Sequence, residues 1–362
     1  MRSCYIHIPF CEKICSYCDF CKIFYNDKLV DQYLDELESE VHILYRGEKL
    51  KTIYIGGGTP SSLNIRQLER LFAITDMLER DDSLEFTVEC NFSSTTKEKL
   101  EVFKKHGVNR LSFGLETTNS KQLNFLEREE CKDRTFKIIK EARKQGFNNI
   151  NVDLMYALPG ESIDELKKDL EFIKSLDIEH VSCYSLIIEE HTKLGIKGTE
   201  NIDGDLDFEM YKTICEFMKA NEFKHYEISN YAKEGYESHH NLVYWDNEKY
   251  YGFGLGASAY IDNRRTSNTR SISNYLKGSY LLEEEILEKD DLVYYEIILN
   301  LRKSDGINLD KLYSKYKVKL EYDELINLGM LEVKDNRLYI PEEKWYISND
   351  IIIRLLEGVV YE

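Results

Sequence analysis

Short apolar runs alternate with longer segments of helical periodicity through the first half of the chain. The helical segments, such as 28–45 and 163–176, place apolar residues three and four positions apart. Six successive strand–helix units predict parallel strands joined by right-handed crossovers. We therefore expect an α/β fold with a partial, six-stranded (βα)6 barrel. The predicted strands are 4–8, 52–55, 84–89, 110–113, 150–154 and 180–185.

The pattern changes after residue 230. Residues 231–290 are rich in Gly, Tyr and Asn, which predicts loops and short strands packing on the barrel. From residue 291 a helical segment is followed by two short strand-like runs, 331–333 and 337–340. A helix followed by a small hairpin indicates a winged-helix-like C-terminal domain. The expected domains are 1–230, 231–290 and 291–362.

Charge and cysteine content narrow the class of protein. The 362 residues carry a net charge of −18 without a basic stripe, which disfavours a nucleic-acid partner. No run of eighteen apolar residues and no signal peptide is present, so we expect a cytoplasmic protein without a transmembrane segment. The nine cysteines then indicate reduced thiols and metal binding rather than disulfides.

Three of these cysteines, Cys11, Cys15 and Cys18, follow the first predicted strand at C-x3-C-x2-C spacing. Three thiolates leave a tetrahedral zinc site one ligand short. They can hold three irons of a 4Fe–4S cluster and leave the fourth iron open to a small chelating molecule. Buried cysteines, or a zinc site with a remote fourth ligand, are the alternatives. The spacing resembles the radical S-adenosylmethionine (SAM) superfamily, which implies SAM on the open iron and its cleavage to a 5′-deoxyadenosyl radical.

Further candidate residues follow the later strands. A glycine-rich turn at 56–60 lets the backbone approach a ligand, through N–H groups toward a carboxylate or carbonyls toward an amino group. Glu89, Glu116 and Asp153 lie at or near strand ends, where parallel barrels build their active sites. Each has a structural alternative: the glycines could form a tight turn, and the carboxylates could cap helices.

The segments 5–20, 56–61, 107–114 and 151–160 resemble the oxygen-independent coproporphyrinogen III oxidase group of radical SAM proteins, and the resemblance covers essentially the whole chain. The family often has Gln at the position of Glu116, and Arg128 could instead be a surface arginine. The SAM contacts that the resemblance implies are Tyr5, Tyr17, Gly57, Gly58, Thr59, Glu89, Glu116, Arg128 and Asp153.

The group has two branches, an oxidase and a heme chaperone. The oxidase pattern has another cysteine two residues after the third, where this chain has Phe20, and a long segment before the first strand. Both differences favour the chaperone branch. Cys21 is displaced by one residue and is either a loop cysteine or a redox-active thiol near the cluster.

A second marker of the chaperone branch is the H-N-x-x-Y-W motif formed with His240, Tyr244 and Trp245. The resemblance implies heme or porphyrin contact there. Neutral imidazole is a good axial ligand, and aromatic rings offer flat faces. The alternative is that His240 is a hydrogen-bonded histidine among core aromatic side chains. His239 is an adjacent alternative ligand. The family commonly has His where this chain has Ser258.

Two functions follow from the resemblance. The first is a heme chaperone that binds a 4Fe–4S cluster, SAM and heme, and delivers heme to membrane-bound heme proteins through peripheral contact or a partner. Arg302 would pair with a propionate or form a surface salt bridge. The second is the oxidase itself, in which the radical abstracts hydrogen from a propionate that is then decarboxylated to a vinyl group. Another radical SAM reaction on a porphyrin-like substrate is a third interpretation.

Overall fold

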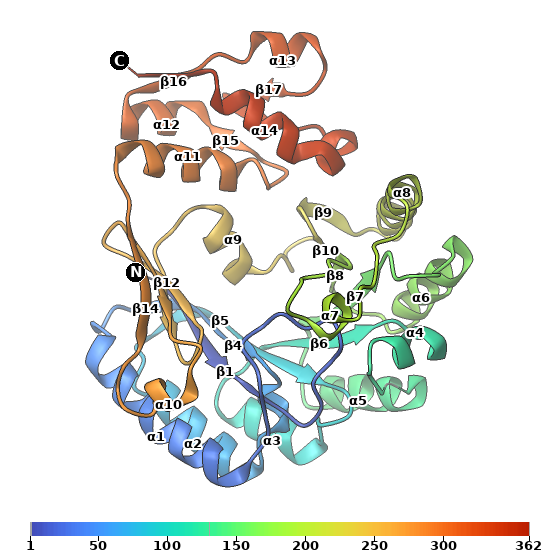
Figure 1. The fold of residues 1–362 in the computed structure, drawn as a ribbon, viewed down its shortest axis with the longest axis vertical. Helices are drawn as coiled ribbons and strands as arrows, with labels where there is room; N and C mark the ends of the chain where they lie inside the picture. Colours follow the sequence, from blue (N-terminus) through green and yellow to red (C-terminus); the bar gives the residue numbers. More distant parts are fainter. Residues whose placement is uncertain (1, 130, 362) are drawn as a thin grey trace.

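The computed structural model describes residues 2–129 and 131–361, and its centre is a nine-stranded sheet (Figure 1). The strand order is β11-β1-β4-β5-β6-β7-β8-β10-β9, and the strands from β1 to β8 in this order are parallel. The predicted partial barrel is confirmed. Its six strands are β1 (Ser3–Ile8), β4 (Leu50–Gly57), β5 (Arg80–Asn91), β6 (Arg110–Glu116), β7 (Ile150–Tyr156) and β8 (His180–Ser185).

Amphipathic helices cover the outer face of the strands (Figure 1). Asn64 and Ser162 each form a capping box that fixes where α2 and α6 begin. The outer helices are α1 (Asp27–Leu44), α2 (Ile65–Thr75), α3 (Lys97–Lys105), α4 (Ser120–Phe125), α5 (Lys132–Lys144), α6 (Ile163–Ser175) and α8 (Gly204–Ala220).

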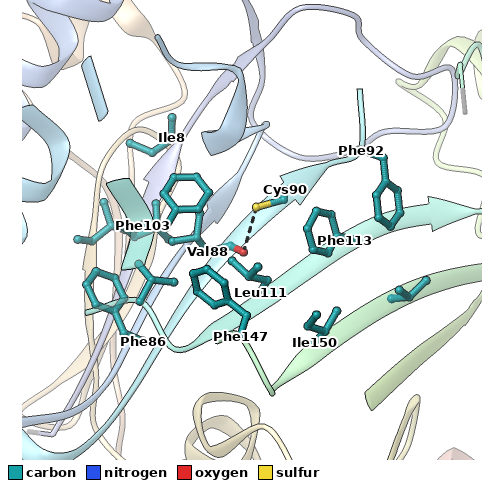
Figure 2. Close-up of a cluster of buried hydrophobic side chains, with 14 of the residues drawn as sticks. Ile8, Phe86, Val88, Cys90, Phe92, Phe103, Leu111, Phe113, Phe147 and Ile150 are labelled. Atoms are coloured by element: carbon teal, nitrogen blue, oxygen red, sulfur yellow. Dashed lines mark hydrogen bonds between the residues drawn. The ribbon is translucent and has the colours of Figure 1, made fainter. Parts of the chain in front are cut away.

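The main hydrophobic core fills the layer between the sheet and these helices. Figure 2 shows Phe86 and Val88 of β5 and Phe113 of β6 among the buried side chains, with Phe103 of α3 packed against them. Residues alternate along each strand, so the neighbouring positions Thr87 and Glu89 take the opposite, inner face. The inner face is therefore polar and can carry chemistry.

Segments distant in sequence extend both edges of the barrel. Strand β11 (Tyr251–Phe253) pairs in parallel with β1. At the other edge, β10 (Asn230–Ala232) pairs antiparallel with β8, and β9 (Lys224–Glu227) pairs antiparallel with β10. The other elements up to residue 286 are β2 (Phe10–Cys11), β3 (Ile23–Phe24), α7 (Lys193–Ile196), α9 (His239–Trp245), β12 (Ser258–Ile261), β13 (Arg264–Asn268), α10 (Ile272–Tyr275) and β14 (Leu281–Ile286).

The C-terminal region has its own hydrophobic core, which begins at Val293 and includes Trp345. We propose the divisions 1–230, 231–290 and 291–362 as units of the fold, supported by this second core. In the part of the chain that the structure describes, the helices lack the extended apolar stretch that spanning a bilayer requires. The C-terminal elements are α11 (Lys289–Asn300), β15 (Ile307–Asn308), α12 (Leu309–Tyr316), β16 (Val318–Leu320), α13 (Asp323–Asn327), β17 (Glu332–Lys334), β18 (Arg337–Tyr339), α14 (Ser348–Leu356) and β19 (Val359–Tyr361).

Candidate functional site

The cysteine loop leaves β1 and is closed by the short parallel pair β2 and β3, in which Phe10 faces Ile23. Ser16, in the middle of this loop, anchors it through two hydrogen bonds. The Ser16 backbone N–H donates to Leu126 O at 3.0 Å, and its hydroxyl donates to Phe125 O at 2.9 Å. These bonds hold the loop against the segment that carries Arg128.

The three cysteines of the motif share one environment. Cys11 is buried, and Cys15 and Cys18 are half-buried. Burial raises the pKa of the Cys11 thiol to about 11, and the charges of Cys18 and Cys15 add to that shift. Thr59 Oγ1 donates to Cys11 Sγ at 3.7 Å, and Arg128 Nη1 donates to Cys15 Sγ at 3.6 Å.

The donor set is three thiols, which is the ligand chemistry of an iron–sulfur cluster with one open iron. Within residues 2–129 and 131–361, no three His, Cys, Asp or Glu side chains are grouped so that they could hold one metal ion. The irons of a cluster occupy separate corners, so its thiolates need not converge on a single point. Cys21 faces elsewhere, because its Cβ would lie 2.6 Å from a Cβ added at Gly256 and its thiol interacts with Arg270.

The glycine turn after β4 packs tightly against β1. A Cβ at Gly57 would lie 2.4 Å from Cε1 of His7, and a Cβ at Gly58 would lie 2.7 Å from the carbonyl carbon of Pro9. The N–H groups are already used: Gly57 N donates to Glu89 Oε2 at 2.8 Å, and Gly58 N donates to Ile8 O at 2.9 Å.

Thr59 N likewise donates to Phe10 O at 2.9 Å. These three N–H groups are thus unavailable to grip a carboxylate. Of the two contacts expected for this turn, only the second is compatible with these bonds: its carbonyl oxygens could accept from an amino group of a ligand.

Glu89 is fixed on the inner face of the sheet. Tyr54 Oη donates to Glu89 Oε1 at 2.7 Å, opposite the bond from Gly57. Burial raises the pKa of Glu89, which these hydrogen bonds partly offset. Tyr5 lies beside this pair, with its ring centroid 6.1 Å from that of Tyr54 and its hydroxyl 2.9 Å from His7 Nδ1.

Glu116 and Arg128 form a buried ion pair between β6 and the cysteine loop. The strand register shifts between Gly114 and Glu116, and Glu116 has a φ of 65°, so the carboxylate leaves the regular ladder. Arg128 Nη1 lies 3.4 Å from Glu116 Oε1, and the two side chains are 8% and 10% exposed. The alternative interpretation of Arg128 as a surface arginine is therefore wrong. Arg128 also contacts Tyr17 Oη at 3.5 Å.

A cavity of about 140 Å³ opens beside this group. Cys15, Thr59, Asn91 and Arg128 contribute to its walls. The cysteine loop, the glycine turn and the segment after β6 thus meet at one hollow, at the end of the barrel where the parallel strands finish.

Asp153 of β7 completes the inner-face carboxylates. Asn151 Nδ2 donates to Asp153 Oδ1 at 2.7 Å. Burial, and then the charge of Glu116, raise the pKa of Asp153 from 3.8 to about 7. A carboxyl group with this raised pKa ionises in the folded state only near neutral pH.

Replacing Asp153 by Asn is expected to stabilise the protein at pH 8. The folded state keeps the Asp153 proton up to about pH 7, whereas the unfolded chain loses it near 3.8, so ionisation lowers stability as pH rises between these values. The free energy of unfolding of the variant therefore exceeds that of the wild type by up to about 4 kcal/mol at pH 8, and the difference disappears below about pH 4. Urea unfolding of both proteins across this pH range measures it, and a gain that does not vary with pH would contradict the assignment.

Tyr54 and Asn91 are contributors that sequence reasoning missed. Tyr54 orients Glu89, and Asn91 Nδ2 donates to Thr59 Oγ1 at 3.2 Å. The signal was available in the alternation of each strand, because Tyr54 and Asn91 share the inner face with Gly56 and Glu89.

The helix α9 carries the H-N-x-x-Y-W motif and lies against the other end of β4. Glu85 accepts hydrogen bonds from the backbone N–H groups of His239 at 3.0 Å and His240 at 2.9 Å. This carboxylate caps the start of α9. The helix is shown between the barrel and the C-terminal domain in Figure 1.

His240 is a hydrogen-bonded core histidine in this structure. The residue is only 1% exposed. Its Nδ1 lies 2.7 Å from Thr52 Oγ1, and its Nε2 lies 2.8 Å from Tyr244 Oη. Burial lowers the pKa of His240 to about 3. Neither nitrogen can reach a heme iron in this conformation, so the predicted ligand role requires α9 to move. His239 is exposed, and Trp245 is half-buried.

Replacing His240 by Ala is expected to lower the free energy of unfolding by about 2–4 kcal/mol, because it leaves a cavity and removes the partner of two buried hydroxyls. His239→Ala is the neighbouring control and should change stability by less than about 0.5 kcal/mol. Urea unfolding measures both. Equal stabilities would show that His240 is not the packed residue described here.

Two other expectations concern single residues. Ser258 starts β12 and is exposed, so it places no ligand in the core. Arg302 Nη2 donates to Asn349 Oδ1 at 2.6 Å, and desolvation lowers the pKa of Arg302. Among the described residues, this guanidinium therefore donates to an amide rather than to the carboxylate of a salt bridge.

Comparisons with known proteins agree with this arrangement. Residues 5–173 match the model of the Radical SAM superfamily. The heme chaperone HemW of Lactococcus lactis subsp. lactis is 38% identical over 98% of this chain and 97% of its own length. HemW of Bacillus subtilis is 38% identical over 97% and 98%. The solved coproporphyrinogen III oxidase HemN of Escherichia coli has the same fold, with a TM-score of 0.86, 20% identity, and coverage of 97% of this chain and 89% of that one.

Proposed function

This chain belongs to the HemW family of heme chaperones within the radical SAM superfamily, and from that premise we propose that it binds heme and delivers it to heme proteins. The proposal includes a 4Fe–4S cluster and SAM as resident cofactors. It also includes peripheral contact with membrane-bound acceptors. The cofactor part rests on residues described above, and the heme part rests on the HemW relationship.

The cluster is proposed at Cys11, Cys15 and Cys18. The observation that carries this assignment is that the thiols share one loop end, next to the cavity lined by Cys15, Thr59 and Arg128. When bound, the cluster supplies an open iron and an electron. The chain itself shields the loop through the packing of Ser16 and holds Cys11 in a dry setting.

SAM is proposed over the adjoining inner-face groups. Its sulfonium is cationic, and the carboxyl groups of Glu89, Glu116 and Asp153 lie close enough to influence one another electrostatically, which supports a cation site beside these acidic groups. Arg128 offers a cation for a carboxylate within the same group. Gly57, Gly58 and Thr59 supply close backbone approach, and Tyr5 and Tyr17 supply aromatic faces on either side.

The heme part of the proposal is supported by the HemW relationship and by Phe20. Phe20 stands where the oxidase pattern has another cysteine, and it is 67% exposed beside the loop. The H-N-x-x-Y-W helix, with His240, Tyr244 and Trp245, remains the porphyrin contact that the family resemblance predicts, and His239 is the member of this helix that faces solvent.

The experiment that separates chaperone from oxidase uses anaerobically reconstituted protein with coproporphyrinogen III, SAM and a reductant. We expect no protoporphyrinogen by mass spectrometry. The Cys15→Ser variant in the same assay gives the background. Protoporphyrinogen formed together with two equivalents of 5′-deoxyadenosine, one for each propionate converted to a vinyl group, and absent from the Cys15→Ser reaction, would establish the oxidase instead.

A further inference from the structure

Arg110 is an arginine buried inside the barrel at the start of β6, with 2% of its surface exposed. Figure 2 shows its neighbour Leu111 in the outer hydrophobic core, so the alternation of the strand places Arg110 on the inner, polar face. In the strand register Arg110 lies opposite Thr87 of β5, and Glu89 lies opposite Ser112. Arg110 and Glu89 are therefore diagonal neighbours on the inner face of adjacent strands.

The guanidinium of Arg110 has no direct partner in the part of the chain that the structure describes. Its Nε is buried without a hydrogen-bond partner, and no carboxylate of the described residues forms an ion pair with it. The two nearby imidazoles, His180 and His240, have both ring nitrogens hydrogen-bonded to other groups. A buried charge that is left unpaired costs stability. Its presence on the inner face therefore points to a role other than holding the fold together.

The charge of Arg110 acts on Glu89 through space. Burial raises the pKa of the Glu89 carboxyl group, and the hydrogen bonds from Tyr54 and Gly57 and the charge of Arg110 lower it. Burial, and then the charge of Arg110, lower the pKa of His240 to about 3. This imidazole is therefore neutral at physiological pH, so it adds no second positive charge to this part of the inner face.

The neighbouring elements also present titratable groups to Glu89. The phenols stay neutral because burial raises their pKa values, and the carboxyl groups oppose the ionisation of Glu89. Arg128 is paired with Glu116 at 3.4 Å, so its charge is offset there. Arg110 is thus an unpaired cation that favours the charged form of Glu89. The groups around Glu89 besides these arginines are Tyr5 of β1, Tyr54 of β4, Glu116 of β6, Asp153 of β7 and Tyr244 of α9.

We propose that Arg110 is a positioning residue that keeps the Glu89 carboxylate charged for a cationic ligand of the barrel, without contacting that ligand itself. The inference rests on the proposed SAM site, where Glu89 is one of the acidic groups beside the sulfonium. The charged form also suits the observed contacts, because Glu89 Oε1 accepts from Tyr54 Oη at 2.7 Å and Oε2 accepts from Gly57 N at 2.8 Å. Both bonds are stronger to a carboxylate than to a neutral carboxyl group. Arg110 thus acts on the ligand site and on the glycine turn through one carboxylate.

The test is isothermal titration of the reconstituted full-length protein with SAM across a series of pH values. Arg110→Met removes the charge and keeps a long side chain. Without the cation the pKa of Glu89 rises, so its carboxylate is lost at a higher pH than in the wild type. We expect SAM to bind about tenfold more weakly than to the wild type at about pH 6, and within about threefold of it at about pH 8.5. A deficit that is equal at every pH, or no deficit at any pH, would overturn the proposal.

Arg110→Lys is the conservative control, because it keeps the positive charge, and it should follow the wild-type curve within about threefold. A loss as large as that of Arg110→Met would show that shape rather than charge matters, against the proposal. Arg110→Gln, a second neutral variant, covers the case in which Arg110→Met does not fold, and should show the same loss at low pH.

The same substitution in a Glu89→Gln background tests whether Arg110 acts through this carboxylate. Arg110→Gln should then cause no further pH-dependent loss of SAM binding, because the side chain at position 89 can no longer ionise. A pH-dependent loss that persisted in this background would overturn the proposal. A wild-type protein that binds no SAM at any pH would instead contradict the proposed function.

Discussion

Cys15→Ser protein, reconstituted anaerobically, is expected to lack the visible absorbance of a 4Fe–4S cluster and to retain less than about a tenth of the wild-type iron. The physical reason is the number of ligands. With three cysteines proposed, each removed thiolate leaves an iron without its protein ligand. Arg128 also loses the sulfur that its guanidinium contacts at 3.6 Å.

Cys21→Ser is the matched control for this result. Cys21 lies three residues after Cys18, but its thiol interacts with Arg270 and packs beside Gly256. We expect its iron and sulfide contents to equal those of the wild type. Iron retained by Cys15→Ser, or lost from Cys21→Ser, would contradict the three-ligand assignment.

Gly57→Ala is expected to lower the free energy of unfolding by about 2–6 kcal/mol. Gly57 has a φ of 112°, which costs a residue with a Cβ about 1–3 kcal/mol. The new Cβ would also lie 2.4 Å from the His7 ring, and such overpacking costs about 1–3 kcal/mol more. Because Gly57 N holds Glu89, displacement of this turn should also weaken SAM binding.

Gly235→Ala is the control that separates the conformational cost of a positive φ from the cost of the close contact with His7. Gly235 has a φ of 82°, but a Cβ there meets nothing within 4 Å, so only the conformational cost remains. Urea unfolding of the two variants should show the larger loss for Gly57→Ala, and isothermal titration with SAM should show weakened binding only for that variant. Equal losses of stability would mean that the close approach to His7 is unimportant.

The sequence pattern predicted the six parallel strands because each is a local apolar run followed by a helix. It did not predict that β11 would pair with β1, or that β9 and β10 would extend the other edge. These pairings join residues such as Tyr5 and Gly252, which are far apart in the chain, and a local pattern carries no information about them.

The candidate site was predictable in part for a related reason. The residues of the cysteine loop and glycine turn are contiguous, so their spacing is visible in the sequence. Availability of a hydrogen-bonding group depends on distant neighbours: Thr52 and Tyr244 occupy both nitrogens of His240, and Ile8 and Glu89 occupy the turn N–H groups.

Heme transfer tests the central claim most directly. Full-length protein with its cluster reconstituted would be loaded with hemin, freed of excess, and mixed with apomyoglobin while the Soret band and the mass of the extracted porphyrin are followed. The heme-carrier account predicts that the protein binds hemin and that heme passes to apomyoglobin with its mass unchanged. Failure to bind hemin, or retention of all heme by this protein, would contradict it.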